Sequence, residues 1–176
     1  QYVRQEVQDG TGKAPELAKD FVGTDSFILT YGDILVPKET YAAMVARFSE
    51  REFDGLLTVT EGEDVTKGGI NFFDGQFCLT RLVEKPTLEY IQQLRDEGML
   101  KEGDPVFYNA GIYLFRPVVF EFTAKLKKSP RNEYELTDAI QAMVEADRSI
   151  AGHLIAGRWV DVRDPEVLAK LESESL

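Results

Sequence analysis

The chain has 176 residues, of which 43% are hydrophobic and 29% are charged, and its formal net charge is −11. That length suits one domain with a sizeable core, and no apolar run approaches the roughly 20 residues that a membrane helix needs. The excess of 31 acidic over 20 basic residues argues against a protein that coats a nucleic-acid backbone.

Strand-like and helix-like segments alternate along the chain. Tyr2–Val7 is typical of a short strand, and the Gly10-Thr11-Gly12 turn ends it. Pro15 suits the first turn of a helix that continues through Phe21. Ser26–Tyr31 is a nearly continuous apolar run, the pattern of a strand buried on both faces. The later expected elements are a helix at Lys38–Arg51, strands at Leu56–Thr60, Gly68–Phe73 and Gln76–Val83, a helix over residues 87–99, a strand at Phe107–Phe115, helices at Pro117–Leu126 and Leu136–Asp147, and strands at Ile150–Ile155 and Arg158–Val162.

This order predicts an α/β domain over residues 1–176, with a mostly parallel central sheet flanked by helices in a Rossmann-like arrangement. Asp74-Gly75 favours a tight hairpin turn between two of the strands. Asp164-Pro165 is a good cap and first turn for a closing helix. The single cysteine, Cys78, forbids an internal disulfide and favours a cytoplasmic protein.

Two aspartates carry the chemistry that the sequence suggests most strongly. Asp33 follows the apolar strand at a glycine turn, and Asp161 lies between two valines in the motif WVDV. Mg²⁺ prefers one or two carboxylates together with substrate phosphate oxygens, so two such aspartates predict a metal–nucleotide site. The alternatives are a turn aspartate that bonds its own backbone for Asp33 and a surface charge for Asp161.

The motif VEKP places Glu84 and Lys85 at the end of a strand that Pro86 stops. A lysine is a compact charge that binds phosphate, and a glutamate accepts hydrogen bonds from hydroxyl groups. A solvated ion pair is the alternative. His153 and Cys78 have no partners at metal-binding or nucleophile spacing, so we expect both to be structural.

Glycines and amides complete the set of candidate residues. Asn109 begins the motif NAG, and Gly69 begins a hairpin strand, where a glycine often marks close approach of a ligand. The amide of Gln5 offers an adjacent donor and acceptor that match the imide edge of a pyrimidine. For Glu133 and Tyr134 of the motif EYELTD, the alternatives to a role at the binding site are helix capping and core packing.

The motifs YGD, VEKP, NAG, EYELTD and WVDV, in this order, resemble those of the sugar-1-phosphate nucleotidylyltransferases, which join a sugar phosphate to a nucleoside triphosphate and release pyrophosphate. The resemblance covers almost the whole chain. It implies that Asp33 and Asp161 bind Mg²⁺ and that Lys85 binds the sugar phosphate. The substrate-binding residues that it implies are Glu84, Gly69, Asn109 and Thr137 for the sugar, Gln5, Gly10 and Thr11 for the base, and Tyr31 of YGD.

The resembled family opens with a glycine-rich loop that carries an Arg and a Pro-Lys pair, and none precedes Tyr2. The chain would therefore correspond to the C-terminal three quarters of the catalytic domain and be catalytically incomplete by itself. The resemblance favours uridine or thymidine nucleotides and leaves the sugar and a homo-oligomeric state open. Two alternatives remain: a non-catalytic nucleotide-sugar-binding or regulatory module, and a glycosyltransferase, although Gly32-Asp33-Ile34 lacks the first aspartate of that class's Asp-X-Asp motif.

Overall fold

The computed structural model describes residues 1–101, 103–162 and 165–174. Its strands are β1 (Phe27–Thr30), β2 (Ile34–Leu35), β3 (Gly55–Thr60), β4 (Gly69–Phe73), β5 (Leu79–Glu84), β6 (Phe107–Phe115), β7 (Ile150–Leu154) and β8 (Val160–Asp161). Its helices are η1 (Pro15–Ala18), α1 (Lys19–Val22), α2 (Glu39–Phe48), η2 (Val65–Lys67), α3 (Leu88–Asp96), α4 (Val119–Thr123), α5 (Leu136–Glu145) and α6 (Pro165–Glu174). Most therefore lie where the sequence pattern predicts them. Among the described residues, no helix is long and apolar enough to cross a membrane.

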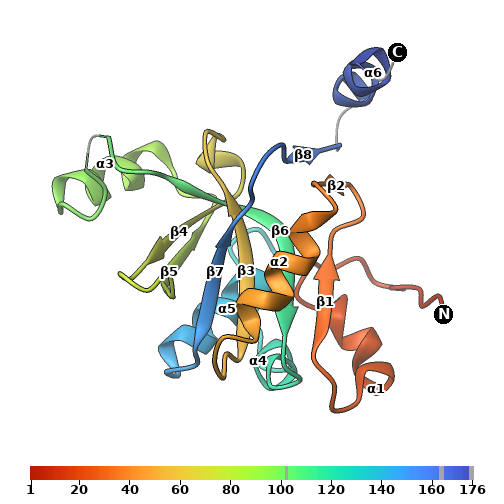
Figure 1. Ribbon diagram of the computed structural model, residues 1–176. Helices are drawn as coiled ribbons and strands as arrows, with labels where there is room; N and C mark the ends of the chain where they lie inside the picture. Colours follow the sequence, from red (N-terminus) through yellow and green to blue (C-terminus); the bar gives the residue numbers. More distant parts are fainter. Residues whose placement is uncertain (102, 163–164, 175–176) are drawn as a thin grey trace.

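A central sheet in the order β5-β4-β6-β3-β7 organises the fold, and β1 also pairs with β6 (Figure 1). The predicted α/β class is confirmed, but the expectation of a mostly parallel sheet is wrong. In this sheet only β3 and β7 pair in parallel, whereas β6 runs antiparallel to β1, β3 and β4. The hairpin of β4 and β5 is antiparallel because its short turn reverses the chain. Hydrophobic periodicity identifies a strand but does not give its direction.

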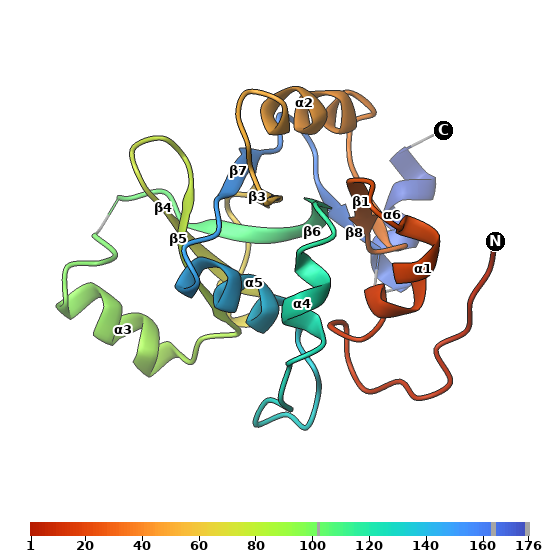
Figure 2. The ribbon, with the colours of Figure 1, turned by 90° about the horizontal axis from the view of Figure 1, so that it is seen from below.

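Helices cover both faces of this sheet, with α2 on one side and α4 and α5 on the other (Figure 2). The alternation of side chains along each strand supplies both cores. On β6, for example, Ile112 and Leu114 pack with Met44 of α2, whereas Tyr113 and Phe115 pack with the α4 and α5 residues. Helix α3 forms a separate small core with β4, around Ile70, Ile91, Leu94 and Leu100.

Four local expectations need correction. Strand β1 is not buried on both faces, because Ile28 and Thr30 on one face are exposed. Tyr2–Val7 is not a strand, because in the described structure it pairs with no other strand and its apolar side chains are exposed. The two-residue strand β2 was missed, since it exists only through its pairing with β8. The turn of the β4–β5 hairpin is longer than Asp74-Gly75 alone, and Phe77 takes the positive φ of 58°. The expected cap at Asp164 lies outside the described residues.

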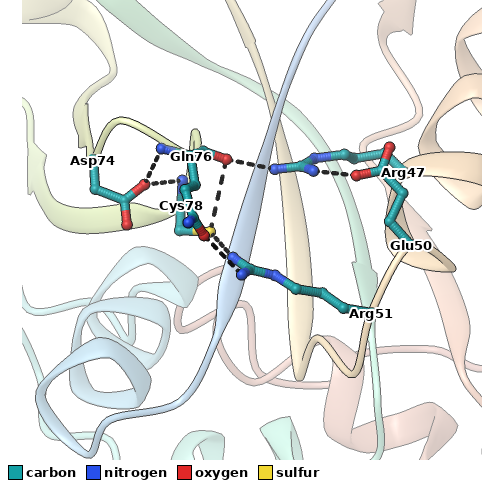
Figure 3. Close-up of polar contacts among 6 residues, drawn as sticks. All are labelled: Arg47, Glu50, Arg51, Asp74, Gln76 and Cys78. Atoms are coloured by element: carbon teal, nitrogen blue, oxygen red, sulfur yellow. Dashed lines mark hydrogen bonds and ion pairs between the residues drawn. The ribbon is translucent and has the colours of Figure 1, made fainter.

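Two arginines, one in the last turn of α2 and one just after the helix, hold that hairpin turn (Figure 3). Arg47 donates to the carbonyl oxygen of Gln76 at 2.7 Å, and Arg51 donates to its side-chain oxygen at 2.9 Å and contacts the Cys78 sulfur. Asp74 accepts hydrogen bonds from the backbone N–H groups of Gln76 and Cys78, each at 2.9 Å. These contacts fix the turn end of the hairpin, and its other end leads to Glu84.

Candidate functional site

The candidate site is built around an irregularity in β6. The register of β6 on β3 shifts between Leu57 and Val59, where Asn109–Tyr113 of β6 span a shorter stretch of β3. This is a β-bulge, a feature that commonly re-aims side chains beside active sites. The buried hydroxyl of Thr58 donates to the carbonyl oxygen of Ile112 at 2.9 Å and so stabilises the bulged backbone.

The bulge also ties two loops to β6. The backbone N–H of Tyr31 donates to the carbonyl oxygen of Gly111 at 3.2 Å, and the indole N–H of Trp159 donates to that of Ala110 at 2.9 Å. Gly111 has a φ of +77°, and a Cβ atom there would lie 2.9 Å from the Tyr31 ring. Only a glycine meets both conditions without strain. The segments that follow β1 and precede β8 are thereby fixed beside the bulge.

A cavity of about 200 Å³ opens next to the bulge. It gathers most of the candidate residues that the sequence predicts, although they come from distant parts of the chain. These are Thr11, Tyr31, Gly69, Glu84, Lys85, Asn109, Thr137 and Asp161. Further lining residues were not predicted, among them Lys67, Tyr108, Tyr113 and Glu135. Trp159, in WVDV, also forms part of the wall.

Glu84 and Lys85 lie where β5 ends. Lys85 has a φ of +42°, which is rare for a residue with a side chain, and its N–H donates to the carbonyl oxygen of Gly68 at 2.8 Å. A Cβ atom on Gly69 would lie 3.3 Å from a carboxylate oxygen of Glu84 and from the Cβ of Asn109. The glycine therefore lets β4 pass close to both of these side chains.

Arg131 is a cation beside the cavity that sequence reasoning missed. Its guanidinium lies 2.8 Å from a carboxylate oxygen of Glu135 and 3.5 Å from one of Glu84. Burial raises the pKa of Glu84, although Arg131, the Thr137 hydroxyl and Lys85 partly oppose the rise. A signal was available, because Arg131 lies two residues before the start of the motif EYELTD, but its contact with Glu84 cannot be predicted from the sequence.

Two polar side chains on the cavity wall differ in their bonding. The amide of Asn109 donates to the Tyr113 hydroxyl at 3.0 Å and accepts from the Gly111 N–H at 3.3 Å. The buried hydroxyl of Thr137 interacts with the Glu84 carboxylate and lowers its pKa, but no hydrogen bond of ordinary geometry satisfies it among the described residues. A buried polar atom so weakly bonded is costly, so its place on a cavity wall suits a hydroxyl that bonds to a bound molecule.

The two aspartates are brought together by the small sheet of β2 and β8. Ile34 pairs with Asp161, and the N–H of Val162 donates to the carbonyl oxygen of Asp33 at 2.8 Å. Asp161 lines the cavity, whereas Asp33 is exposed and lies outside its lining. The described residues include no group of three or more His, Cys, Asp or Glu that could hold a metal by themselves. A magnesium ion commonly takes one or two protein carboxylates, with substrate oxygens and waters as its other ligands.

The predicted base-reading residues lie in a second cavity of about 760 Å³, which shares Thr11, Tyr31 and Glu133 with the first. Gln5 and Gly10 both line it, and the Gln5 amide donates to the Gly10 carbonyl oxygen at 3.3 Å. Gly10 has a φ of +125°, and a Cβ atom there would overlap the backbone of Tyr134. The turn is thus docked on the EYELTD segment.

His153 and Cys78 lie away from both cavities. The pKa of His153 is lowered by its burial and by the nearby charge of Arg47. Neither residue lines either of these cavities.

Comparisons with known proteins place the chain among nucleotide-transferring enzymes. The profile of the family described as Nucleotidyl transferase matches residues 1–175. The chain is 33% identical over 180 residues to a low-salt glycan biosynthesis nucleotidyltransferase, Agl11, of Haloferax volcanii, covering 99% of the chain and 46% of the relative. It is 29% identical over 167 residues to a glucose-1-phosphate thymidylyltransferase of Streptomyces griseus, covering 91% of the chain and 41% of that protein.

A UDP-glucose pyrophosphorylase crystallised with UDP-glucose has the same fold, with a TM-score of 0.80 at 19% identity over 99% of the chain and 65% of that structure. The chain spans less than half the length of the curated relatives named above.

Proposed function

This chain belongs to the nucleotidyl transferase family, whose relatives here are sugar-phosphate nucleotidylyltransferases, and we propose that it forms a nucleoside diphosphate sugar and pyrophosphate from a sugar-1-phosphate and a nucleoside triphosphate. The observation that carries this proposal is the cavity beside the β6 bulge. It brings Glu84, Lys85 and Asn109 together with the buried hydroxyl of Thr137. These groups suit a phosphorylated sugar.

In the proposed reaction, a phosphate oxygen of the sugar-1-phosphate attacks the α-phosphorus of the nucleoside triphosphate. A new phosphorus–oxygen bond forms, and the bond between the α-phosphorus and its bridging oxygen breaks. Pyrophosphate then leaves with the bonding electron pair. Chemistry of this kind depends on positioning and charge neutralisation and needs no protein nucleophile.

Each cavity residue has a role in this scheme. Lys85 neutralises the attacking sugar phosphate. The carboxylate of Glu84 accepts hydrogen bonds from sugar hydroxyls, and Arg131 holds that carboxylate in place from 3.5 Å. Gly69 leaves room for the sugar ring, while Asn109 and Thr137 bond to its polar edge.

A magnesium ion fits the donors present. Asp161 offers a carboxylate at the cavity, and Asp33 immediately precedes β2, the strand that pairs with it. One or two carboxylates are the usual protein share of a magnesium–nucleotide site, with phosphate oxygens supplying the remainder. The bound ion would neutralise charge on the triphosphate. Asp33 and Asp161 are the residues that would hold it.

The second cavity would receive the base of the nucleotide. Gln5 and Gly10 line it, and Tyr31 and Thr11 also line the first cavity, beside the β6 bulge, which we call the sugar cavity. The amide of Gln5 can pair with a pyrimidine imide, so we expect uridine or thymidine triphosphate to be preferred over guanosine triphosphate. For this pairing the Gln5 amide must give up its bond to Gly10.

Calorimetry and a pyrophosphate assay test the proposal on the protein that carries this chain. Uridine, thymidine and guanosine triphosphates would each be titrated with Mg²⁺, and pyrophosphate release would be followed with glucose-1-phosphate. Binding of a pyrimidine nucleotide with pyrophosphate release is the expected result. Binding of nucleotide-sugars without any release would instead assign a binding or regulatory module, and sugar transfer from them would assign a glycosyltransferase. Tighter binding of guanosine triphosphate would overturn the base assignment.

A further inference from the structure

The Tyr113 side chain is fully buried under the sugar cavity, yet it carries a polar group that the proposed reaction does not use. A buried phenol hydroxyl needs partners for both its oxygen and its hydrogen. The oxygen accepts a hydrogen bond from the Asn109 amide at 3.0 Å. The hydroxyl of Tyr31 is its second polar neighbour and helps to raise the pKa of Tyr113, and the two rings meet edge-on at 6.0 Å.

The contact between Asn109 and Tyr113 depends on the bulge. Residues four apart in a regular strand lie roughly 13 Å from each other along it, with parallel side chains, so their polar tips do not meet. Here the backbone departs from the regular strand between the two residues, at Gly111 with its φ of +77°. The bulge therefore brings the amide and the phenol together.

The orientation of the Asn109 amide is then defined from both ends. The Gly111 N–H can only donate, so the atom that it contacts must be the amide oxygen. The amide nitrogen is left to donate to Tyr113. Each atom of the amide keeps one bonding position for a molecule in the cavity. Without Tyr113 only the longer bond from the Gly111 N–H, at 3.3 Å, would hold the amide in this orientation.

We propose that Tyr113 is a positioning residue that acts through Asn109: together with the Gly111 N–H, it holds the amide in the one orientation that presents its donor and acceptor to the bound sugar phosphate. The inference rests on the proposed function for its kinetic consequence, but the geometry that it claims is independent of catalysis. Burial above all raises the pKa of Tyr113 well above its ordinary value. The phenol therefore stays protonated and keeps both of its bonding roles at neutral pH.

A double-mutant cycle tests this proposal on the protein that carries the chain. Tyr113→Phe removes only the hydroxyl and should lower kcat/KM for the sugar-1-phosphate about tenfold, the effect of one lost hydrogen bond of about 1.4 kcal/mol. In an Asn109→Ala background the same change should cost less than about twofold, because the residue through which it acts is absent. Equal losses in both backgrounds would overturn the proposal. It would also be overturned if Asn109→Ala lowers activity but Tyr113→Phe causes no loss in either background.

The matched control is Thr123→Val, which also removes a buried hydroxyl, one that bonds only to the Phe120 carbonyl oxygen on α4, away from the cavity. It should leave kcat/KM unchanged. A second readout is the NMR signal of the Asn109 side-chain amide, which Tyr113→Phe should shift whether or not the protein is active. An unmoved signal would overturn the positioning role. If the signal shifts while the unchanged protein releases no pyrophosphate, the proposed function fails and the positioning claim stands.

Discussion

The backbone N–H of Lys85 donates to the carbonyl oxygen of Gly68 at 2.8 Å while Lys85 itself has a φ of +42°. A residue with a side chain pays about 1 kcal/mol or more in this region, and such strain gathers at functional sites. The bond to Gly68 holds the strained residue at the end of β5, beside the cavity. The next position, Pro86, cannot adjust its own φ to relieve the strain.

Replacing Lys85 with glycine should therefore raise stability and lower activity together. Lys85→Gly removes the strain and should increase the free energy of unfolding in urea by about 1 kcal/mol. It should also weaken use of the sugar-1-phosphate while leaving nucleoside triphosphate binding nearly intact. Lys38→Gly, at an exposed residue with a φ of −59°, is the control and should give no gain. Unchanged kinetics with the sugar phosphate would make Lys85 a surface ion-pair residue.

The pH dependence of stability should report the environment of Glu84. Burial raises its pKa in the folded protein above the ordinary value of 4.5, so the folded state binds the proton more tightly than the unfolded state. The contribution of protonated Glu84 to the free energy of unfolding is fully present below about pH 4.5. It is lost as the pH rises through the pKa that Glu84 has in the folded protein.

Glu84→Gln should remove that loss, so the variant should gain stability relative to the unchanged protein between about pH 4 and pH 7. Urea unfolding at both pH values measures the difference. The exposed Glu50, substituted by Gln, should give parallel curves with the unchanged protein. A Glu84→Gln curve parallel to that of the unchanged protein would contradict burial of this carboxylate.

Substitution of Asp33 or Asp161 should change the response of the enzyme to Mg²⁺, whereas substitution of another exposed carboxylate should not. Asp33→Asn and Asp161→Asn should each reduce kcat at saturating substrates by about a hundredfold, since both would neutralise the triphosphate through the ion. Asp25→Asn, at an exposed residue between α1 and β1, should have no effect. Magnesium titrations of the nucleotide complex measure the change. Undiminished magnesium dependence in both aspartate variants would end the metal assignment.

Gly111 should be intolerant of even the smallest side chain. Gly111→Ala places a Cβ atom 2.9 Å from the Tyr31 ring at a φ of +77°, so it should cost about 1–2 kcal/mol in urea unfolding. Gly75→Ala is the matched control, because nothing lies within 4 Å of a Cβ atom there and its φ is ordinary. Equal stability of the two variants would contradict the close packing of the bulge on Tyr31.

The sequence predicts the elements of this fold better than their relations. The β6 limits, Phe107–Phe115, were predicted to the residue, because an apolar run with clear ends reports a buried strand. The place of Glu84 at the end of β5 was also predictable, since Pro86 stops the strand. Strand direction was not, because side-chain alternation is the same in parallel and antiparallel pairs.

The site shows the same division. Lys85 and Asn109 could be selected by residue type and motif, and both line the cavity. The bulge that brings Asn109 to Tyr113 could not be predicted, because it depends on the register between β6 and the distant strand β3. Arg131 was missed for a related reason, since its contact with Glu84 joins two separate segments.

The parallel pairing of β3 with β7 has a consequence for how the chain is made. Gly55 pairs with Ile150, nearly 100 positions later in the chain. The edge of β3 that pairs with β7 therefore has no partner until almost all of the described chain has been synthesised. Until then Leu56, Leu57 and Val59, all fully buried in the folded state, lie on a strand with one open edge. Non-local pairing of this kind slows folding and leaves a nascent chain open to aggregation. We therefore expect the nascent chain to need protection by chaperones until β7 has emerged from the ribosome.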